Sequence, residues 1–223
     1  MELIDALRTT GAVRDFTDQA VDDAVLARVL DNARFAPSGS NAQAWRVVVV
    51  KDAANRRRLR DCYLRGSRDY LALAAAGLRP WSPTNDRDAE ARALAAENTE
   101  TPGGFAARFD ETPVLLALFA DLSKLAAIDR DADRYTFAAG ASIYPFAWNV
   151  LLAARDEGLG GVITTIAIRE EAQVKAILGA PDPLALAAII ALGYPVRQPR
   201  RLRREPLTSF VTVDSIDGSV FEV

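Results

Sequence analysis

The chain has 223 residues, of which half are hydrophobic and about a quarter are charged, as is typical of a soluble globular domain. A formal net charge of −3 and a pI near 5.2 argue against a general nucleic-acid-binding protein. The single cysteine, Cys62, excludes an internal disulfide, and the absence of histidine excludes Ser-His-Asp and Cys-His catalysis within the chain. If the chain is an enzyme, we therefore expect a bound cofactor to supply its chemistry.

The first half of the chain predicts helices and a strand in alternation. A short helix over residues 2–7 is followed by residues 21–34, whose apolar side chains recur at helical spacing until Pro37 prevents continuation. The β-branched run 46–50 predicts a strand covered on both faces. Residues 52–76 then predict one or two helices with a solvated basic face.

A polar loop separates the second helix from this strand. It offers amides, hydroxyls and free backbone N–H groups at the edge of a core, and these suit a flat heterocycle with a polar rim. Ordinary turn residues joining a helix to a strand would look the same, so composition leaves both readings open. The residues concerned are Ser38, Gly39, Ser40, Asn41 and Gln43.

Residues 77–104 are the least regular part of the chain, with prolines and glycines on either side of a polar helix at 87–97. We interpret this region as an inserted lid. Within it, Trp81 is suited either to stacking on a substrate or to pinning the loop, and the sequence does not choose between them.

The second half predicts two buried strands and a long helix. The strands are expected at residues 113–120 and 184–192, and the helix at 135–157, with a kink at Pro145. The helix contains an uncharged stretch from 136 to 154, which we interpret as buried rather than membrane-spanning because it holds several small and polar residues. With no apolar signal region at the N-terminus, we expect a cytoplasmic protein.

Two further features have several readings. Glycines at 158–161 precede Val162 and allow the backbone to approach a ligand closely. A basic cluster near the C-terminus has three interpretations: a solvated tail, a nucleic-acid patch or a phosphate clamp. Its members are Arg197, Arg200, Arg201, Arg203 and Arg204.

Four segments together resemble the FMN-dependent nitroreductase family, in the order in which that family carries them. APSGSNAQAW resembles its APSxxNxQPW element, and TTGAVRDF resembles its RRSxRxF element. GASIYPFAWNVLLAARDEGLGGVITTI and IIALGYPVRQPRRLRREPLTSFV resemble its central helix and its last strand with the basic segment. The resemblance implies one α+β domain over residues 1–223, with a mixed β-sheet flanked by helices, a long dimer helix, an inserted lid and an exchanging C-terminal arm.

The resemblance also implies an FMN site between the two subunits of a homodimer. Arg14 would lie beside the N1 and O2 edge of the flavin, and the loop at residues 37–43 would often reach the flavin of the partner subunit. A backbone N–H in the strand after Gly161 would bond the flavin N5, and arginines would hold the phosphate. The residues implied are Arg14, Pro37, Ser38, Gly39, Asn41, Gln43, Gly161, Val162, Ile163, Thr164, Thr165, Arg201, Arg203 and Arg204.

The implied activity is an NAD(P)H-dependent reduction of nitroaromatics, quinones or related acceptors by a ping-pong mechanism, without a catalytic side chain or a metal. The alternatives are a same-fold flavoenzyme with other chemistry (a ring dehydrogenase, a dehalogenase or a flavin-fragmenting enzyme) and a non-catalytic flavin-binding protein. Two departures bear on the choice. Thr10, Gly11 and Ala12 stand where the family often has arginine and serine, and the stretch 163–165 lacks the usual proline and Glu-Gly pair.

Overall fold

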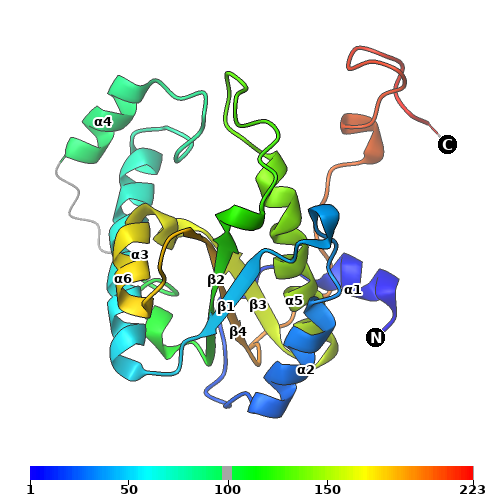
Figure 1. Cartoon of the computed structure of the whole chain (residues 1–223). Coiled ribbons are helices and arrows are strands. Elements are labelled where there is room, and N and C mark those ends of the chain that lie inside the picture. Colours follow the sequence, from blue (N-terminus) through cyan, green and yellow to red (C-terminus); the bar gives the residue numbers. More distant parts are fainter. Residues whose placement is uncertain (97–101, 223) are drawn as a thin grey trace.

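A computed structural model of the chain describes residues 1–96 and 102–222. A four-stranded antiparallel sheet with strand order β1-β2-β4-β3 lies between two layers of helices (Figure 1). The strands are β1 (Trp45–Val49), β2 (Val114–Asp121), β3 (Gly160–Thr164) and β4 (Leu184–Gly193). The fold is α+β, as predicted. The parallel component expected of a mixed sheet is limited, among the described residues, to one isolated bridge between Ala12 and Gly161.

Helices cover both faces of this sheet and enclose two apolar clusters. α2 (Asp23–Ala33) and α5 (Tyr144–Asp156) pack on one face, and α3 (Ala53–Ala75) and α6 (Glu171–Leu178) pack on the other. The two central strands, β2 and β4, carry the apolar runs that the sequence marked as buried. β1 was predicted to be covered on both faces, and this is wrong. It is an edge strand and its side chains are only partly buried, with Val49 36% exposed.

The predicted long helix is shorter than expected. α5 begins at Tyr144, and Pro145 occupies its first turn, where its missing N–H costs nothing and no kink results. Residues 138–142 form a separate 3₁₀ turn. Tyr144 and Trp148 are 42% and 36% exposed, so this helix is not fully buried. Among the described residues, no helix combines the length and apolar character needed to cross a membrane.

Two shorter helices lie away from the sheet. α1 (Leu3–Thr9) packs beside α5, and α4 (Arg87–Ala95) follows α3 in the predicted lid. Figure 1 shows α4 and the connection after β2 at the same end of the molecule. They meet where Arg87, itself 2.7 Å from Glu90, donates to the hydroxyl of Tyr135. Part of the predicted lid, residues 97–101, lies outside the described residues.

The C-terminal arm extends away from the sheet in Figure 1. Residues 207–222 are mostly exposed and make a small hairpin-like contact between Thr212 and Val220. Exchange of this arm with a partner subunit stays a prediction.

Arg56 is not part of a solvated basic face, contrary to the sequence interpretation. Its guanidinium donates to three backbone carbonyls, at 3.0 Å to Val50, at 2.9 Å to Asp110, and to Thr112. Partial burial lowers the pKa of Arg56. The side chain joins the start of α3 to the segments that leave β1 and enter β2.

We expect Arg56→Met to lower the free energy of unfolding by about 3 kcal/mol, because it leaves these carbonyls without a donor. The neighbouring Arg57→Met, on the exposed face of α3, is expected to change it by less than about 0.5 kcal/mol. Urea unfolding followed by circular dichroism measures both. Equal effects of the two substitutions would contradict a structural role for Arg56.

Candidate active site

The N-terminal segment after α1 runs along the outer edge of β3. Val13 donates its N–H to the Gly161 carbonyl at 2.9 Å, and Ala12 bridges to Gly161. A few residues on, Val196 donates its N–H to the Asp15 carbonyl at 3.1 Å. Arg14 therefore lies between two backbone anchors, one on β3 and one on the segment that leaves β4. Arg14 and Gly161, both predicted site residues, are thus brought to the same edge of the sheet through the neighbouring Val13.

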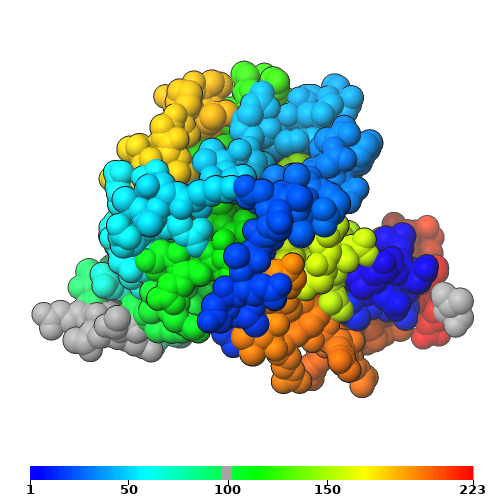
Figure 2. Space-filling model, turned by 90° about the horizontal axis from the view of Figure 1, so that it is seen from below, coloured from blue at the N-terminus to red at the C-terminus, as the bar shows by residue number. Residues whose placement is uncertain are grey.

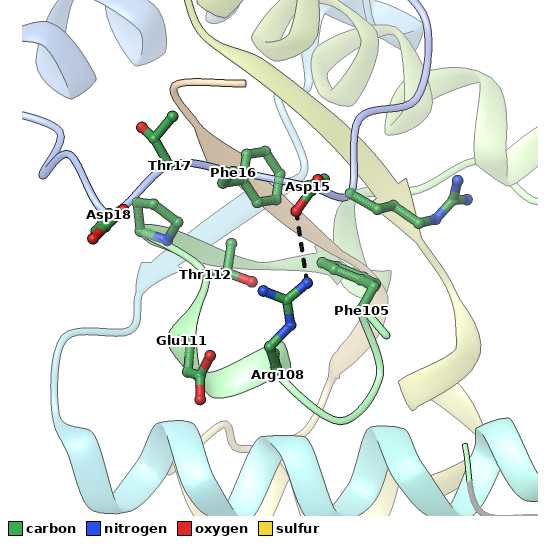
Figure 3. Close-up of a pocket in the computed structure, with 10 residues that line it drawn as sticks. Asp15, Phe16, Thr17, Asp18, Phe105, Arg108, Glu111 and Thr112 are labelled. Atoms are coloured by element: carbon green, nitrogen blue, oxygen red, sulfur yellow. Dashed lines mark ion pairs between the residues drawn. The ribbon is translucent and has the colours of Figure 1, made fainter. Parts of the chain in front are cut away.

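Arg14 lines a cleft of about 180 Å³. Figure 3 shows Phe105 and Arg108 on one side of this cleft and Asp15 on the other. Arg108 Nη2 lies 3.6 Å from Asp15 Oδ1, so the neighbouring carboxylate is paired with Arg108 rather than with Arg14. Among the described residues no ion pair is recorded for the Arg14 guanidinium, which is exposed and open to an anionic or electron-rich ligand.

The two glycines directly before Val162 allow close packing of β3. A Cβ added to Gly161 would lie 2.4 Å from Leu192 Cδ2 and 2.6 Å from the Ala191 oxygen. A Cβ added to Gly160 would lie 2.8 Å from Val13 Cγ2. Side chains at these positions would separate β3 from β4 and from the N-terminal segment. Packing alone therefore accounts for these glycines, and a close approach of a ligand to the Gly161 backbone stays a prediction.

The side chains of residues 162–165, the rest of the predicted flavin-binding segment, differ in the face of the sheet to which they belong and in their exposure. Val162 belongs to the apolar cluster on the α3 side, whereas Ile163 packs against the cluster on the α5 side. Thr164 is buried and Thr165 is exposed at the start of a 3₁₀ turn. Thr165 is thus the member of this stretch whose surroundings leave room for a ligand.

The basic C-terminal segment lies against the N-terminal motif. A Cβ added to Gly11 would lie 2.7 Å from Leu202 Cδ2, so Leu202 occupies the space that a side chain at position 11 would fill. Figure 2 shows the blue N-terminal segment against the orange C-terminal segment. Arg201 and Arg203, both exposed, flank Leu202, and Arg204 donates to the Arg203 carbonyl at 2.7 Å.

The polar loop is strained. Ser40, Asn41 and Gln43 have φ values of 50°, 53° and 47°, in the left-handed region that side chains rarely adopt. Such strain persists only where surrounding structure imposes it, and it gathers at functional sites. Gln43 donates its N–H to Ser38 Oγ at 3.0 Å, and Gly39 donates to Ser142 Oγ at the same distance. The exposed amides of Asn41 and Gln43 are held 3.2 Å apart, and Pro37 precedes the loop.

Within one chain the predicted site residues form two groups. The loop belongs to the α5 side of the sheet, because the flanking Ala36 and Ala44 lie in that cluster. Phe105, from the cleft beside Arg14, belongs to the α3 side. The structure places Arg14 beside the start of β3 and Leu202 of the basic segment against Gly11, whereas the loop lies in the α5 layer.

Sequence reasoning missed Tyr63. This residue of α3 is buried, and Thr164 Oγ1 donates to its hydroxyl at 3.2 Å. Tyr63 gave no signal in the sequence because an aromatic residue on a helix face reads as ordinary core.

Comparison with known proteins agrees with this architecture. The chain is 29% identical over 226 aligned positions to an NADH dehydrogenase of Thermus thermophilus, with 90% of each chain covered. It is 30% identical over 183 positions to the 5,6-dimethylbenzimidazole synthase of Rhodospirillum rubrum, covering 82% of this chain and 77% of that protein. Among solved structures, iodotyrosine deiodinase bound to FMN and 3-iodo-L-tyrosine superposes with a TM-score of 0.68 at 23% identity, covering 96% and 100% of the two chains. Nitroreductase A of Vibrio parahaemolyticus superposes with a TM-score of 0.67 at 22% identity, covering 96% and 76%.

The fold is therefore that of a cofactor-dependent α+β oxidoreductase. The model of the Nitroreductase family matches residues 7–194, and the chain belongs to this family.

Proposed function

We propose that the protein is an FMN-dependent oxidoreductase that takes electrons from NAD(P)H and passes them to nitroaromatics, quinones or related acceptors. The observation that carries the proposal is Arg14, fixed beside β3 by the Val13 hydrogen bond, exposed and at the edge of the cleft. The names of relatives support the donor: one is a Thermus thermophilus NADH dehydrogenase, and another, 26% identical, is a putative NAD(P)H nitroreductase of Bacillus subtilis. FMN supplies hydride acceptance at N5 and onward electron transfer.

Residues of the N-terminal segment and of the basic C-terminal segment fit FMN. The positive charge of Arg14 favours the negative charge that the pyrimidine edge acquires on reduction. Among the described residues, Thr10 Oγ1 is buried without a hydrogen-bond partner next to Gly11, and its hydroxyl would donate to a phosphate there. Leu202 docks on Gly11, and its exposed neighbours Arg201 and Arg203 would hold the phosphate. They would take over the function of the arginine and serine that the N-terminal motif lacks.

The other group of site residues would come from a second copy of the chain. Asn41 and Gln43 present two amides at the edge of the α5 layer, where hydrogen bonds to a flavin of the partner subunit would satisfy them. Exposed apolar side chains on α1 and α5 support a homodimer joined at this layer. They are Leu3, Ile4, Leu7, Tyr144 and Trp148.

The visible spectrum of the purified protein tests the proposal. We expect protein incubated with FMN and passed over a desalting column to stay yellow. Anaerobic NADH or NADPH should bleach it, and a nitroaromatic such as nitrofurazone should restore the colour. Protein that emerges colourless would contradict flavin binding.

A yellow complex that neither NADH nor NADPH bleaches would contradict the proposed activity while leaving FMN in place. Relatives named iodotyrosine deiodinase and 5,6-dimethylbenzimidazole synthase define the same-fold chemistries to assay in that case.

A further inference from the structure

Tyr63 is a phenol fixed in position on the face of α3 that meets the end of β3. Its side chain is 4% exposed. The ring stacks on Phe109 with centroids 4.3 Å apart, and it meets Phe105 edge to face at 5.8 Å. Two aromatic contacts at nearly right angles leave the ring little freedom, so the position of its hydroxyl is determined by packing.

That hydroxyl contacts the last residue of β3. Thr164, 6% exposed, donates from Oγ1 to Tyr63 Oη at 3.2 Å, which leaves the phenolic hydrogen available for donation. Burial raises the pKa of Tyr63, against opposing effects of the Thr164 hydrogen bond and the positive charge of Arg14. The phenol is therefore neutral at physiological pH and lies within the influence of Arg14.

A second contact from α3 follows one helical turn later. A Cβ added to Gly66 would lie 2.8 Å from both the Ile166 oxygen and Ile166 Cγ2, so α3 touches the backbone of Ile166 directly. The two contacts lie on either side of the exposed Thr165. α3 therefore holds residues 164–166 through one hydrogen bond and one backbone approach.

We propose that Tyr63 is a positioning residue for the flavin, whose hydroxyl holds Thr164 and thereby orients the backbone of Thr165 and Ile166 toward the bound ring. The inference rests on the proposed function and on the implied bond between the flavin N5 and a backbone N–H of the strand after Gly161. Without the phenolic oxygen, the Thr164 hydroxyl loses its partner in an apolar setting, and the end of β3 relaxes to satisfy it.

A double-mutant cycle tests the inference, with Tyr63→Phe, Thr164→Val and the combination of both. Each variant is measured for the melting temperature of the apoprotein, the Kd for FMN and the midpoint potential of the bound flavin. We expect Tyr63→Phe to raise the Kd for FMN about fivefold to tenfold and to make the potential more negative. The combined variant buries no unpaired hydroxyl, so its melting temperature should recover while its Kd and potential stay altered.

Tyr70→Phe is the matched control, because Tyr70 lies two turns further along α3 and is 44% exposed. It should leave all three quantities unchanged. If the combined variant regains the wild-type Kd and midpoint potential, the hydrogen bond between Tyr63 and Thr164 serves stability alone, and the inference is overturned. If the wild type binds FMN and Tyr63→Phe binds it equally well, the inference is overturned and the proposed function stands. If the wild type does not bind FMN, the proposed function is overturned as well.

Discussion

Replacing Arg201 and Arg203 together by alanine raises the Kd for FMN about a hundredfold, whereas the Kd for riboflavin changes by less than about twofold. Each guanidinium is expected to form a charge-assisted hydrogen bond to the phosphate, worth about 1.5–3 kcal/mol, less in a partly solvated site. Riboflavin lacks the phosphate, so it reports any loss of ring binding separately. Fluorescence quenching of each flavin on titration with apoprotein measures both constants.

Two controls separate a phosphate clamp from a general change in charge. Arg57→Ala with Arg58→Ala removes the same charge from the exposed outer side of α3 and should leave both constants unchanged. Arg204→Ala should have a smaller effect than either Arg201→Ala or Arg203→Ala, because Arg204 bonds the Arg203 carbonyl. Equal weakening of FMN and riboflavin would show that this segment holds the fold rather than the phosphate.

Arg14→Ala slows reduction of the bound flavin by NAD(P)H about thirtyfold and weakens flavin retention. A unit charge about 4 Å from the developing negative charge is worth up to about 4 kcal/mol at an effective dielectric constant near 20. We expect about half of that to be realised, because the Arg14 side chain is exposed. Anaerobic stopped-flow absorbance at the flavin band measures the rate.

Arg14→Lys keeps the charge and should stay within about threefold of the wild type, because a point charge suffices for this electrostatic effect. Arg28→Ala removes an arginine that pairs with Glu157 on the α5 side, at 2.7 Å, and serves as a control far from the cleft. Wild-type reduction and retention in Arg14→Ala would remove this residue from the site.

The C-terminal segment shows which features of the candidate site are visible in the sequence and which only in the structure. The basic cluster was visible in the sequence, and so were three possible roles for it. The docking of Leu202 on Gly11 joins residues 191 positions apart, and it is the reason that we propose Arg201 and Arg203 for the phosphate. No local pattern encodes a contact across that separation, because it depends on how the intervening elements pack.

For the polar loop, too, the sequence revealed one part of the site and the structure another. Its residues, and their likeness to a known motif, were evident from the sequence. The left-handed backbone at Ser40, Asn41 and Gln43 was not, because none of them is glycine, the residue that favours this conformation. Their separation from Arg14 within one chain followed only from the layer to which each element belongs.

By itself, the sequence determined the elements whose signal is local. Apolar periodicity located α2, continuous apolar runs located β2 and β4, and the absence of histidine pointed to a cofactor. Tertiary structure alone decided that β1 lies at an edge, that the glycines at 160 and 161 serve packing, and that Tyr63 meets Thr164. The reason is physical: periodicity reports which face of an element is buried, whereas strand order and side-chain contacts depend on the element that buries it.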